Sequence, residues 1–330
     1  MPKRIFSGAQ PTNQLHLGNY LGALRNWVEL QHEYESFFCV VNLHAITVQQ
    51  GPAALVEKTR ELARIYLAAG IDPTISTVFI QSDVAEHAEL AWILNCVTRM
   101  SELDRMTQFK EKGKQQRENT SVGIFNYPVL MASDILLYQT DLVPVGQDQK
   151  QHLELTRDLA IRFNRDYGET FRVPDPYIPK VGARIMALDN PEKKMSKSDE
   201  SPHGAILLLD NADTVRRKFK RAVTDSGSEM RFDPTRPAIT NLLTIYQLLT
   251  ARTRDKIETH FSDKGYAQLK AELADVTIEF LTPFQERVSA IADEELDRTL
   301  ASGCERAREI ASVTLEEVKL KMGLRGGETH

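Results

Sequence analysis

The chain has 330 residues, of which 42% are hydrophobic and 26% charged, a composition typical of globular proteins and unlike that of disordered chains. Its formal net charge of −5 means that any contact with nucleic acid must come from a local basic patch. Because the sequence has no signal-peptide pattern, no long apolar run and no Cys-x-x-Cys pair among its three cysteines, we expect a soluble, cytoplasmic protein with reduced thiols and no membrane contact.

The first half of the chain alternates short apolar runs with helical patterns. The runs are typical of buried parallel strands and lie at residues 4–6, 37–42, 77–81, 142–145 and, less clearly, 183–188. Apolar residues at helical spacing predict helices at residues 18–31, 52–69, 83–100, 128–138 and 149–163. This alternation predicts an α/β fold with a Rossmann-like parallel sheet, which binds ligands beyond the carboxyl ends of its strands.

The second half of the chain has helical patterns without strand patterns. Helical spacing occurs at residues 211–223, 238–249, 252–261, 266–290 and 294–322. We therefore expect two domains: a Rossmann-like catalytic domain over residues 1–205, with a polar connecting insertion around 100–125, and a helical domain over residues 206–330.

A first motif follows the first predicted strand, where a Gln-Pro-Thr-Asn turn leads into His16-Leu17-Gly18-Asn19 at a predicted helix start. The free amides of a helix N-terminus attract anions, and a glycine leaves room for a flat ligand. His16, Asn19 and Gln10 offer donors for a phosphate, so the segment suits a nucleotide in a chain without either glycine-rich nucleotide motif. On these residues alone, the alternative that Asn19 caps a helix and His16 lies at the surface stays open.

A second motif reads Lys194-Met195-Ser196-Lys197-Ser198. Two lysines three residues apart, with one apolar residue between them, indicate a mobile, exposed loop. An ammonium group on a flexible stem can follow the charge that develops on a transferring phosphate. A solvated basic loop explains the string by itself, but its place after the last predicted strand favours a phosphate site.

Together, the strings HLGN at 16–19 and KMSKS at 194–198 resemble the two signatures of the class I aminoacyl-tRNA synthetases. The ending on Asn19 resembles the tyrosine and tryptophan branch of that class. Further strings between residue 5 and about residue 320 resemble the bacterial tryptophanyl-tRNA synthetases: FSGAQPT, HAITV, RMTQFKEK, YPVLMASDILLYQTDLVPVG, DQKQHLELTRDLA and AVTDS.

The chain departs from the family pattern at three places. Gln147 stands where the family commonly has a glutamate, which puts a contact to the ATP ribose in doubt. Asn42 and Leu43 replace the Asp-Gln of a Val-Asp-Gln-His string, and residues 236–242 replace a Gly-Ile-Ser-Asn pattern. None of these changes touches a lysine of the second motif or Asp134.

The resemblance implies a two-step reaction, in which the carboxylate of L-tryptophan attacks the α-phosphate of ATP and the tryptophanyl group then passes to tRNA(Trp). Since that carboxylate is already a nucleophile, catalysis must come from alignment and from neutralising phosphate charge, with Mg²⁺ bridging ATP oxygens. By resemblance, the catalytic lysines are Lys194, Lys197 and Lys112. The residues expected around ATP are Gln10, Pro11, Thr12, Gly18, Asn19, Gly146, Gln147, Asp148, Ile185, Lys194, Met195, Ser196, Lys197 and Ser198.

Asp134 is the one acid in the apolar stretch 127–135, and helical spacing puts it on the same face as Tyr127 and Met131. A carboxylate on an apolar face needs a partner, which is either a local cap or salt bridge or, as the resemblance implies, the single N–H donor of an indole. Such a site discriminates against residues without that donor by about 10⁴–10⁵, which fits a chain with no large insertion for editing. The residues expected around tryptophan are Asp134, Phe6, His44, Tyr127, Met131, Val145 and Gln149.

Other expectations concern partners and alternatives. By resemblance the protein is a homodimer whose C-terminal helices read the anticodon. Candidates for this contact are Tyr246, Arg252 and residues 306–308. The basic cluster at 216–221 either contacts the tRNA backbone or forms a solvated helix face. Asp148, His152 and Glu154 lack the pattern of a zinc site, and no metal ligands are expected. Two other functions stay open: a tyrosyl-tRNA synthetase, and a non-catalytic paralogue that binds RNA or tryptophan.

Overall fold

The computed structural model describes residues 2–12, 14–106, 121–146, 149–178, 184–196, 203–227 and 229–325. Its strands are β1 (Arg4–Ala9), β2 (Glu35–Val40), β3 (Ser76–Ile80), β4 (Leu142–Pro144) and β5 (Asp175–Tyr177). The helices of the first half are α1 (Leu17–Asn19), the π-helical turn η1 (Tyr20–Leu24), α2 (Arg25–Leu30), α3 (Asn42–Ala45), α4 (Pro52–Ala69), the 3₁₀ turn η2 (Gln81–Asp83), α5 (Glu86–Val97), α6 (Met100–Leu103), α8 (Val122–Leu136) and α9 (Lys150–Tyr167). The helices of the second half are α10 (Ala212–Arg221), α11 (Pro237–Thr250), α12 (Arg254–Phe261), α13 (Tyr266–Ala290) and α14 (Asp293–Lys321).

The strands form one parallel sheet in the order β3-β2-β1-β4-β5. The chain runs outward from β1 through β2 to β3 and then returns to place β4 on the other side of β1. The carboxyl ends of β1 and β4 therefore flank the point at which the strand order reverses. In sheets of this kind a ligand crevice forms at that point, so the segments after β1 and β4 are placed to form a site.

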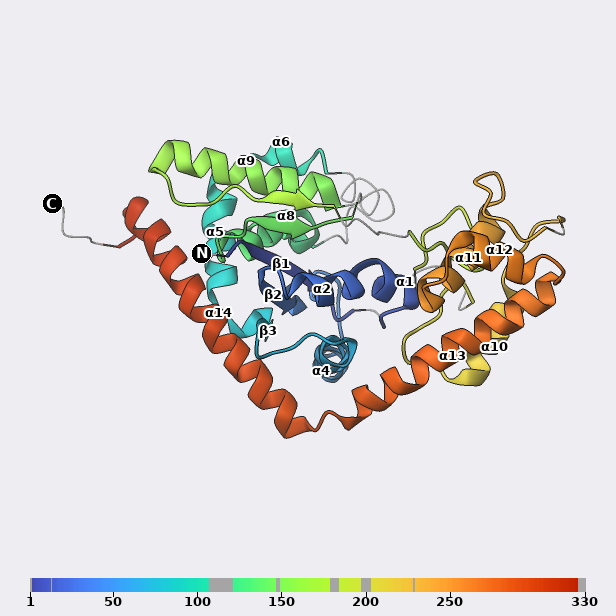
Figure 1. Ribbon diagram of the computed structural model, residues 1–330. Coiled ribbons are helices and arrows are strands. Elements are labelled where there is room, and N and C mark those ends of the chain that lie inside the picture. The colour runs from blue at the N-terminus through green and yellow to red at the C-terminus, as the bar shows by residue number, and fades with distance from the viewer. Residues whose placement is uncertain are drawn as a thin grey trace.

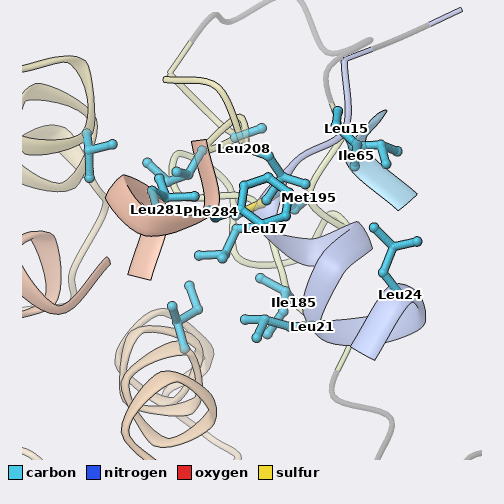
Figure 2. Packing of buried hydrophobic residues seen from close by; sticks show 14 of the residues in the cluster. Leu15, Leu17, Leu21, Leu24, Ile65, Ile185, Met195, Leu208, Leu281 and Phe284 are labelled. Carbon is cyan, nitrogen blue, oxygen red and sulfur yellow. The ribbon is translucent and has the colours of Figure 1, made fainter. Parts of the chain in front are cut away.

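Both faces of the sheet are buried, so the residues that alternate along β2 pack into two different cores. On β2, Phe38 and Val40 belong to a core that also contains α2, α4 and helices α10 to α13. Phe37 and Cys39 alternate with them and belong to a second core with α5, α8, α9 and α14. Figure 2 shows part of the first core, where side chains from the N-terminal helices meet those of α13.

The C-terminal helices form two arms that meet at the turn between α13 and α14 (Figure 1). Helices α10 to α13 lie together at one end of the molecule, while α14 returns along the sheet beside α5 and β3. This return requires a glycine, because a Cβ at Gly303 of α14 would lie 1.8 Å from the carbonyl oxygen of Val78 on β3. Arg306 secures the same contact by donating to the carbonyl oxygens of Pro73 and Ser76.

The α/β class, the helical second half and most predicted elements are confirmed, α4 and α13 with the predicted bounds. The predicted fifth strand at 183–188 is wrong. Its described part, 184–188, makes only an isolated bridge between Met186 and Lys194, and the fifth strand is β5. This strand escaped prediction because it is a three-residue edge strand of sequence Asp-Pro-Tyr, with no apolar run. The predicted helix at 128–138 begins earlier, at Val122, with Pro128 inside it.

Candidate active site

In the first motif, the side chains of His16 and Asn19 each accept a hydrogen bond from the other residue's backbone amide, at the start of the helical segment after β1. His16 caps α1: its Nδ1 accepts from the amide of Asn19 at 3.2 Å, and the side chain of Asn19 accepts from the amide of His16 at 3.0 Å. The histidine and the asparagine of the motif thus satisfy each other, as a capping box does. Gly18 is required between them, because a Cβ there would lie 3.0 Å from the His16 ring and 3.4 Å from Ile185.

His16 is buried, with 7% of its surface exposed, so it is not the surface histidine of the alternative reading. Burial, and then the charge of Lys194, lower the pKa of His16 from 6.5 to about 4. The ring is therefore neutral near pH 7. Since Nδ1 accepts from Asn19, the proton is on Nε2, which makes His16 a neutral donor.

The second motif is held by its backbone. Met186 and Lys194 form an antiparallel bridge, the amide of Met195 donates to the carbonyl of Ile185 at 2.9 Å, and Asn241 of α11 holds both the amide and the carbonyl of Met186 at 2.9 Å. Met195 is 1% exposed and packs in the first core (Figure 2). The prediction of an exposed loop is thus right for Lys194 and wrong for Met195, whose burial contributes about 1.5–3 kcal/mol of anchoring.

The two motifs meet in space although 175 residues separate them. Leu17 donates its amide to the carbonyl of Ile206 at 2.8 Å, and His16 forms a bridge with Leu207. Ile185, which pairs with the lysine loop, lies against Gly18, and Lys194 is close enough to His16 to affect its pKa. One exposed ammonium group and one neutral ring donor therefore lie near each other where the two motifs meet.

Of the other residues predicted around ATP, Gln10, Pro11 and Thr12 follow β1, Gly146 follows β4, and Ser196 belongs to the second motif. Gln10 is exposed, Pro11 is buried, and the carbonyl of Thr12 accepts from Lys58 at 3.2 Å. Gly146 is exposed after β4, and Ser196, next to Met195, is half-buried. Five predicted residues fall outside the described ranges: Lys112, Gln147, Asp148, Lys197 and Ser198.

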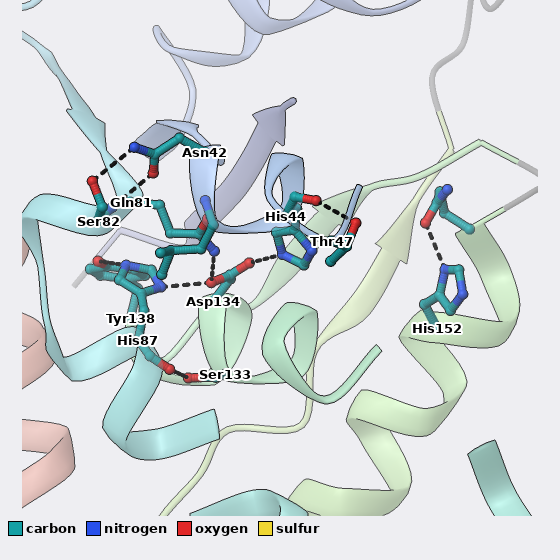
Figure 3. A network of polar contacts seen from close by, with 12 residues as sticks. Asn42, His44, Thr47, Gln81, Ser82, His87, Ser133, Asp134, Tyr138 and His152 are labelled. Carbon is teal, nitrogen blue, oxygen red and sulfur yellow. Dashed lines mark hydrogen bonds and ion pairs between the residues drawn. The ribbon is translucent and has the colours of Figure 1, made fainter. Parts of the chain in front are cut away.

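Asp134 of α8 lies at the centre of a buried polar network (Figure 3). Its Oδ1 accepts from Gln81 Nε2 at 2.6 Å and from His87 Nδ1 at 2.7 Å, and its Oδ2 accepts from His44 Nε2 at 2.7 Å. Among the described residues, these three side chains are its hydrogen-bond partners. Since a carboxylate has about four acceptor positions, one position remains, on Oδ2.

Asp134 is 1% exposed, and such burial alone would raise its pKa. The charge of His44 and the hydrogen bonds from His44 and His87 outweigh burial, so that the pKa lies well below its ordinary value. The carboxylate is therefore ionised at neutral pH and accepts without donating. Side chains of the protein therefore pair three acceptor positions of Asp134, as in the salt-bridge alternative, and the indole N–H stays a prediction for the fourth.

A second, partly buried chain of hydrogen bonds connects Tyr127, His152 and Gln149. The ring of Tyr127 packs edge to face against the ring of His44, with centroids 6.3 Å apart. The hydroxyl of Tyr127 contacts His152 Nε2 at 2.8 Å. The other nitrogen of His152, Nδ1, contacts Gln149 Oε1 at 2.7 Å. Burial raises the pKa of Tyr127, which keeps the hydroxyl as a donor. Both nitrogens of His152 are thus engaged in hydrogen bonds. In the described part of the chain, no three His, Cys, Asp or Glu side chains are grouped to hold a metal.

The apolar residues predicted around tryptophan all pack in the second core. Phe6 is buried and stacks on Tyr138 with ring centroids 5.5 Å apart, while Met131 and Val145 are half-buried at the margin of that core. Contacts thus connect four of the seven predicted residues, namely Asp134, His44, Tyr127 and, through His152, Gln149. Val145 follows β4 directly, while Phe6 lies in the middle of β1.

Sequence reasoning missed two residues that bind Asp134, Gln81 and His87, and Tyr138, whose hydroxyl contacts His87. Gln81 and His87 follow β3, which is separated from β4 by the two strands β2 and β1. Their importance depends on packing between α5 and α8, which no local sequence pattern indicates. A signal was nevertheless present. A buried acid needs several donors, and a glutamine directly after an apolar strand with a histidine at the next helix start was a candidate pair.

A family model described as "tRNA synthetases class I (W and Y)" matches residues 1–282. The chain therefore belongs to the class I aminoacyl-tRNA synthetases of the tryptophan and tyrosine branch, as its two motifs predicted. Across the described ranges, no helix is long and apolar enough to span a membrane.

Relatives in this family indicate the branch. The tryptophan–tRNA ligase of Wolinella succinogenes is 56% identical over 324 residues, which cover 98% of this chain and 99% of that protein. The enzyme of the same name from Caldanaerobacter subterraneus is 57% identical and covers 98% of each chain.

Solved structures agree with the fold. Tryptophanyl-tRNA synthetase from Mycoplasma pneumoniae has a TM-score of 0.91 at 40% identity, over 98% of this chain and 99% of that one. The Campylobacter jejuni enzyme, complexed with ADP and tryptophan, has a TM-score of 0.83 at 32% identity, over 97% and 99%. These matches confirm the predicted fold class and the predicted enzyme class.

Proposed function

We propose that this protein activates L-tryptophan with ATP, forming tryptophanyl-adenylate and pyrophosphate, and then transfers the tryptophanyl group to tRNA(Trp). The observation that carries this proposal is the state of Asp134: it is buried and ionised, and donors from the described residues fill all but one of its acceptor positions. The names of the relatives and the bound tryptophan of the Campylobacter structure support it.

In this proposal the indole N–H of tryptophan donates to Oδ2 of Asp134. His44 and Tyr127 flank that carboxylate, and Phe6, Met131 and Val145 supply apolar surface for the indole ring. A phenylalanine ring would leave the last acceptor of a buried carboxylate unpaired, and a site of this kind discriminates by about 10⁴–10⁵. Gln149, placed by His152, is a polar contact for the amino-acid end of the substrate.

At the other side of the crevice, Lys194 and the neutral Nε2–H of His16 hold the phosphates of ATP. The amide of Gly18 belongs to the helix start at α1, where the helix dipole favours an anion. Lys197 and Lys112 add charge as the pyrophosphate departs. Gln10, Pro11 and Thr12 hold the nucleotide from the β1 side, and Gly146 with Gln147 and Asp148 from the β4 side.

The rest of the assignment follows from the same proposal. Mg²⁺ binds together with ATP, coordinated by the triphosphate oxygens. Residues 1–205 form the catalytic domain, with its insertion around 100–125, and residues 206–330 the anticodon-binding part. The protein acts in the cytoplasm as a homodimer, and the exposed side chains of Trp92 and Met100, 70% and 68% accessible, support a subunit interface near α5.

Pyrophosphate exchange with each aromatic amino acid in turn tests the proposal. Tryptophan with MgATP should support exchange, and tyrosine and phenylalanine should be weaker in kcat/KM by at least about 10³-fold. Exchange with tyrosine in place of tryptophan would indicate a tyrosyl-tRNA synthetase. No exchange with any of the three would indicate a non-catalytic paralogue.

A further inference from the structure

The two oxygens of the Asp134 carboxylate have different surroundings. Oδ1 takes two donors, Gln81 Nε2 at 2.6 Å and His87 Nδ1 at 2.7 Å, and is full. Oδ2 takes the single donor of His44 at 2.7 Å and keeps one position. The difference between the oxygens depends on Gln81 and His87, to which the proposed function gives no contact with the substrate.

His87 is held in one tautomer. Its Nδ1 lies against an ionised carboxylate oxygen and its Nε2 lies 2.7 Å from the hydroxyl of Tyr138 (Figure 3). Burial raises the pKa of Tyr138 well above its ordinary value, so the hydroxyl keeps its proton and donates to Nε2. The proton of a neutral His87 is therefore on Nδ1, directed at Asp134.

The surroundings of His87 fix its position as well as its tautomer. The side chain is 0% exposed, and its ring packs against Phe79 of β3 with centroids 5.9 Å apart. The hydroxyl of Ser133, next to Asp134 on α8, donates to the backbone carbonyl of His87 at 2.7 Å. The start of α5 and the last turn of α8 are thus joined by two contacts, one from Ser133 and one from Asp134.

We propose that His87, fixed by Tyr138, is a specificity-determining positioning residue that keeps Oδ1 of Asp134 filled, so that Oδ2 offers the single acceptor left for a substrate N–H. This inference rests on the proposed function and deepens it. His87 does not touch the substrate. It acts by leaving one unpaired acceptor position on the Asp134 carboxylate and by fixing the orientation of that carboxylate.

The physical consequence is a stricter demand for one donor. With Oδ1 filled and the carboxylate fixed, a substrate without an N–H leaves a buried acceptor unpaired, which is costly. Without His87, the carboxylate gains a second vacancy and freedom to turn or to take a proton. Its penalty for a substrate without a donor then falls, and so does its attraction for tryptophan.

The test compares tryptophan with 3-(benzothiophen-3-yl)alanine, in which sulfur replaces the indole N–H, by pyrophosphate exchange. We expect the unchanged protein to favour tryptophan in kcat/KM by about 10³-fold or more. His87→Leu should lower that ratio by about 10²-fold, mainly through KM for tryptophan, since a hydrogen bond to a charged buried group is lost. His87→Asn, whose amide keeps a donor near the Nδ1 position, should recover most of the ratio.

Tyr138→Phe removes one oxygen and leaves the packing in place, and should lower the ratio by about 10-fold because His87 loses its fixed tautomer. Tyr266→Phe is the matched control: it removes a hydroxyl on α13 that donates to Asp225, and it should leave the ratio unchanged. If His87→Leu does not fold, the Tyr138→Phe ratio decides.

A ratio within twofold of the unchanged protein in folded His87→Leu, or in Tyr138→Phe when the former does not fold, overturns the inference. An equal loss of kcat for both amino acids also overturns it, because it indicates a structural role only. The proposed function fails in a different way, namely if the unchanged protein does not activate tryptophan at all.

Discussion

The two sides of the site, around Asp134 and around Lys194, each fix the position of a charged group, but they do so by different kinds of contact. Around Asp134 the holding atoms belong to side chains from three separate segments, and all of them are buried. Around Lys194 the holding atoms are mostly backbone, from Ile185, Met186 and Met195, and the charged group itself is exposed.

The difference indicates what each side controls. A buried charged network has a high cost if one member is lost, so it fixes one arrangement and selects one substrate. A lysine on a backbone-anchored loop keeps the freedom to follow a departing phosphate, so it affects the rate. Changes near Asp134 should therefore appear in KM for the amino acid, and changes at the lysine loop in kcat.

The largest effect is expected for Asp134→Ala. This change removes the acceptor for the indole N–H and leaves three donors without their partner, so kcat/KM for tryptophan should fall by about 10³–10⁴-fold. Rejection of phenylalanine should relax at the same time, while KM for ATP stays the same. Steady-state pyrophosphate exchange with both amino acids gives these values. Unchanged selectivity in a folded variant would refute the indole assignment.

Lys194→Ala should come next. Loss of one ammonium group from the phosphate side should lower kcat of exchange by about 10²–10³-fold with a smaller change in KM for ATP. Lys193→Ala is the matched control, since it removes the neighbouring exposed lysine and should change kcat by less than about threefold. Equal losses in the two variants would indicate general charge rather than a phosphate contact.

A smaller effect concerns stability and pH. The pKa of His16 is about 4 in the folded protein and 6.5 when unfolded, so the unfolded chain takes up the proton first as pH falls. The stability that the neutral ring contributes is present above pH 6.5 and is lost as pH falls towards 4, by about 2–3 kcal/mol. Urea unfolding at pH 7 and pH 4.5 should show this loss in the unchanged protein and a smaller one in His16→Gln. The same loss in both would place the titration elsewhere.

The smallest effect is expected for Asn241→Ala, which frees the backbone of Met186 behind the lysine loop. We expect kcat to fall by about 10-fold, with KM for tryptophan unchanged, because the lysine is less well placed rather than removed. Thr244→Ala is the control, since it lies on the same helix and its hydroxyl donates to the carbonyl of Thr240 within that helix. A change in KM for tryptophan would mean that the two sides of the site are coupled.

The sequence predicted the parts of the fold that depend on long, regular patterns. Helices α4 and α13 have the predicted bounds because 18 and 25 residues of amphipathic spacing leave little doubt about the period. Strand β5 has three residues and two exposed ones, so no period was available. The run at 184–188 is apolar because it packs in the first core, not because it joins the sheet.

The site divides in the same way. The two motifs and Asp134 were predicted because each is a local string or a local conflict, an acid on an apolar helix face. Gln81, His87 and Tyr138 were not, because their function depends on one carboxylate that lies 53 residues from Gln81 and 47 from His87 in the chain. Likewise, the burial of Met195 depends on its contact with the core and not on its neighbours in the sequence.

The central claim is tested most directly by a crystal structure of the protein with bound tryptophan at neutral pH. We expect the indole nitrogen within about 2.7–3.2 Å of Asp134 Oδ2, with Gln81 and His87 still on Oδ1. An indole nitrogen bonded to any other group, or a ligand donor that has displaced His87 from Oδ1, would contradict the account.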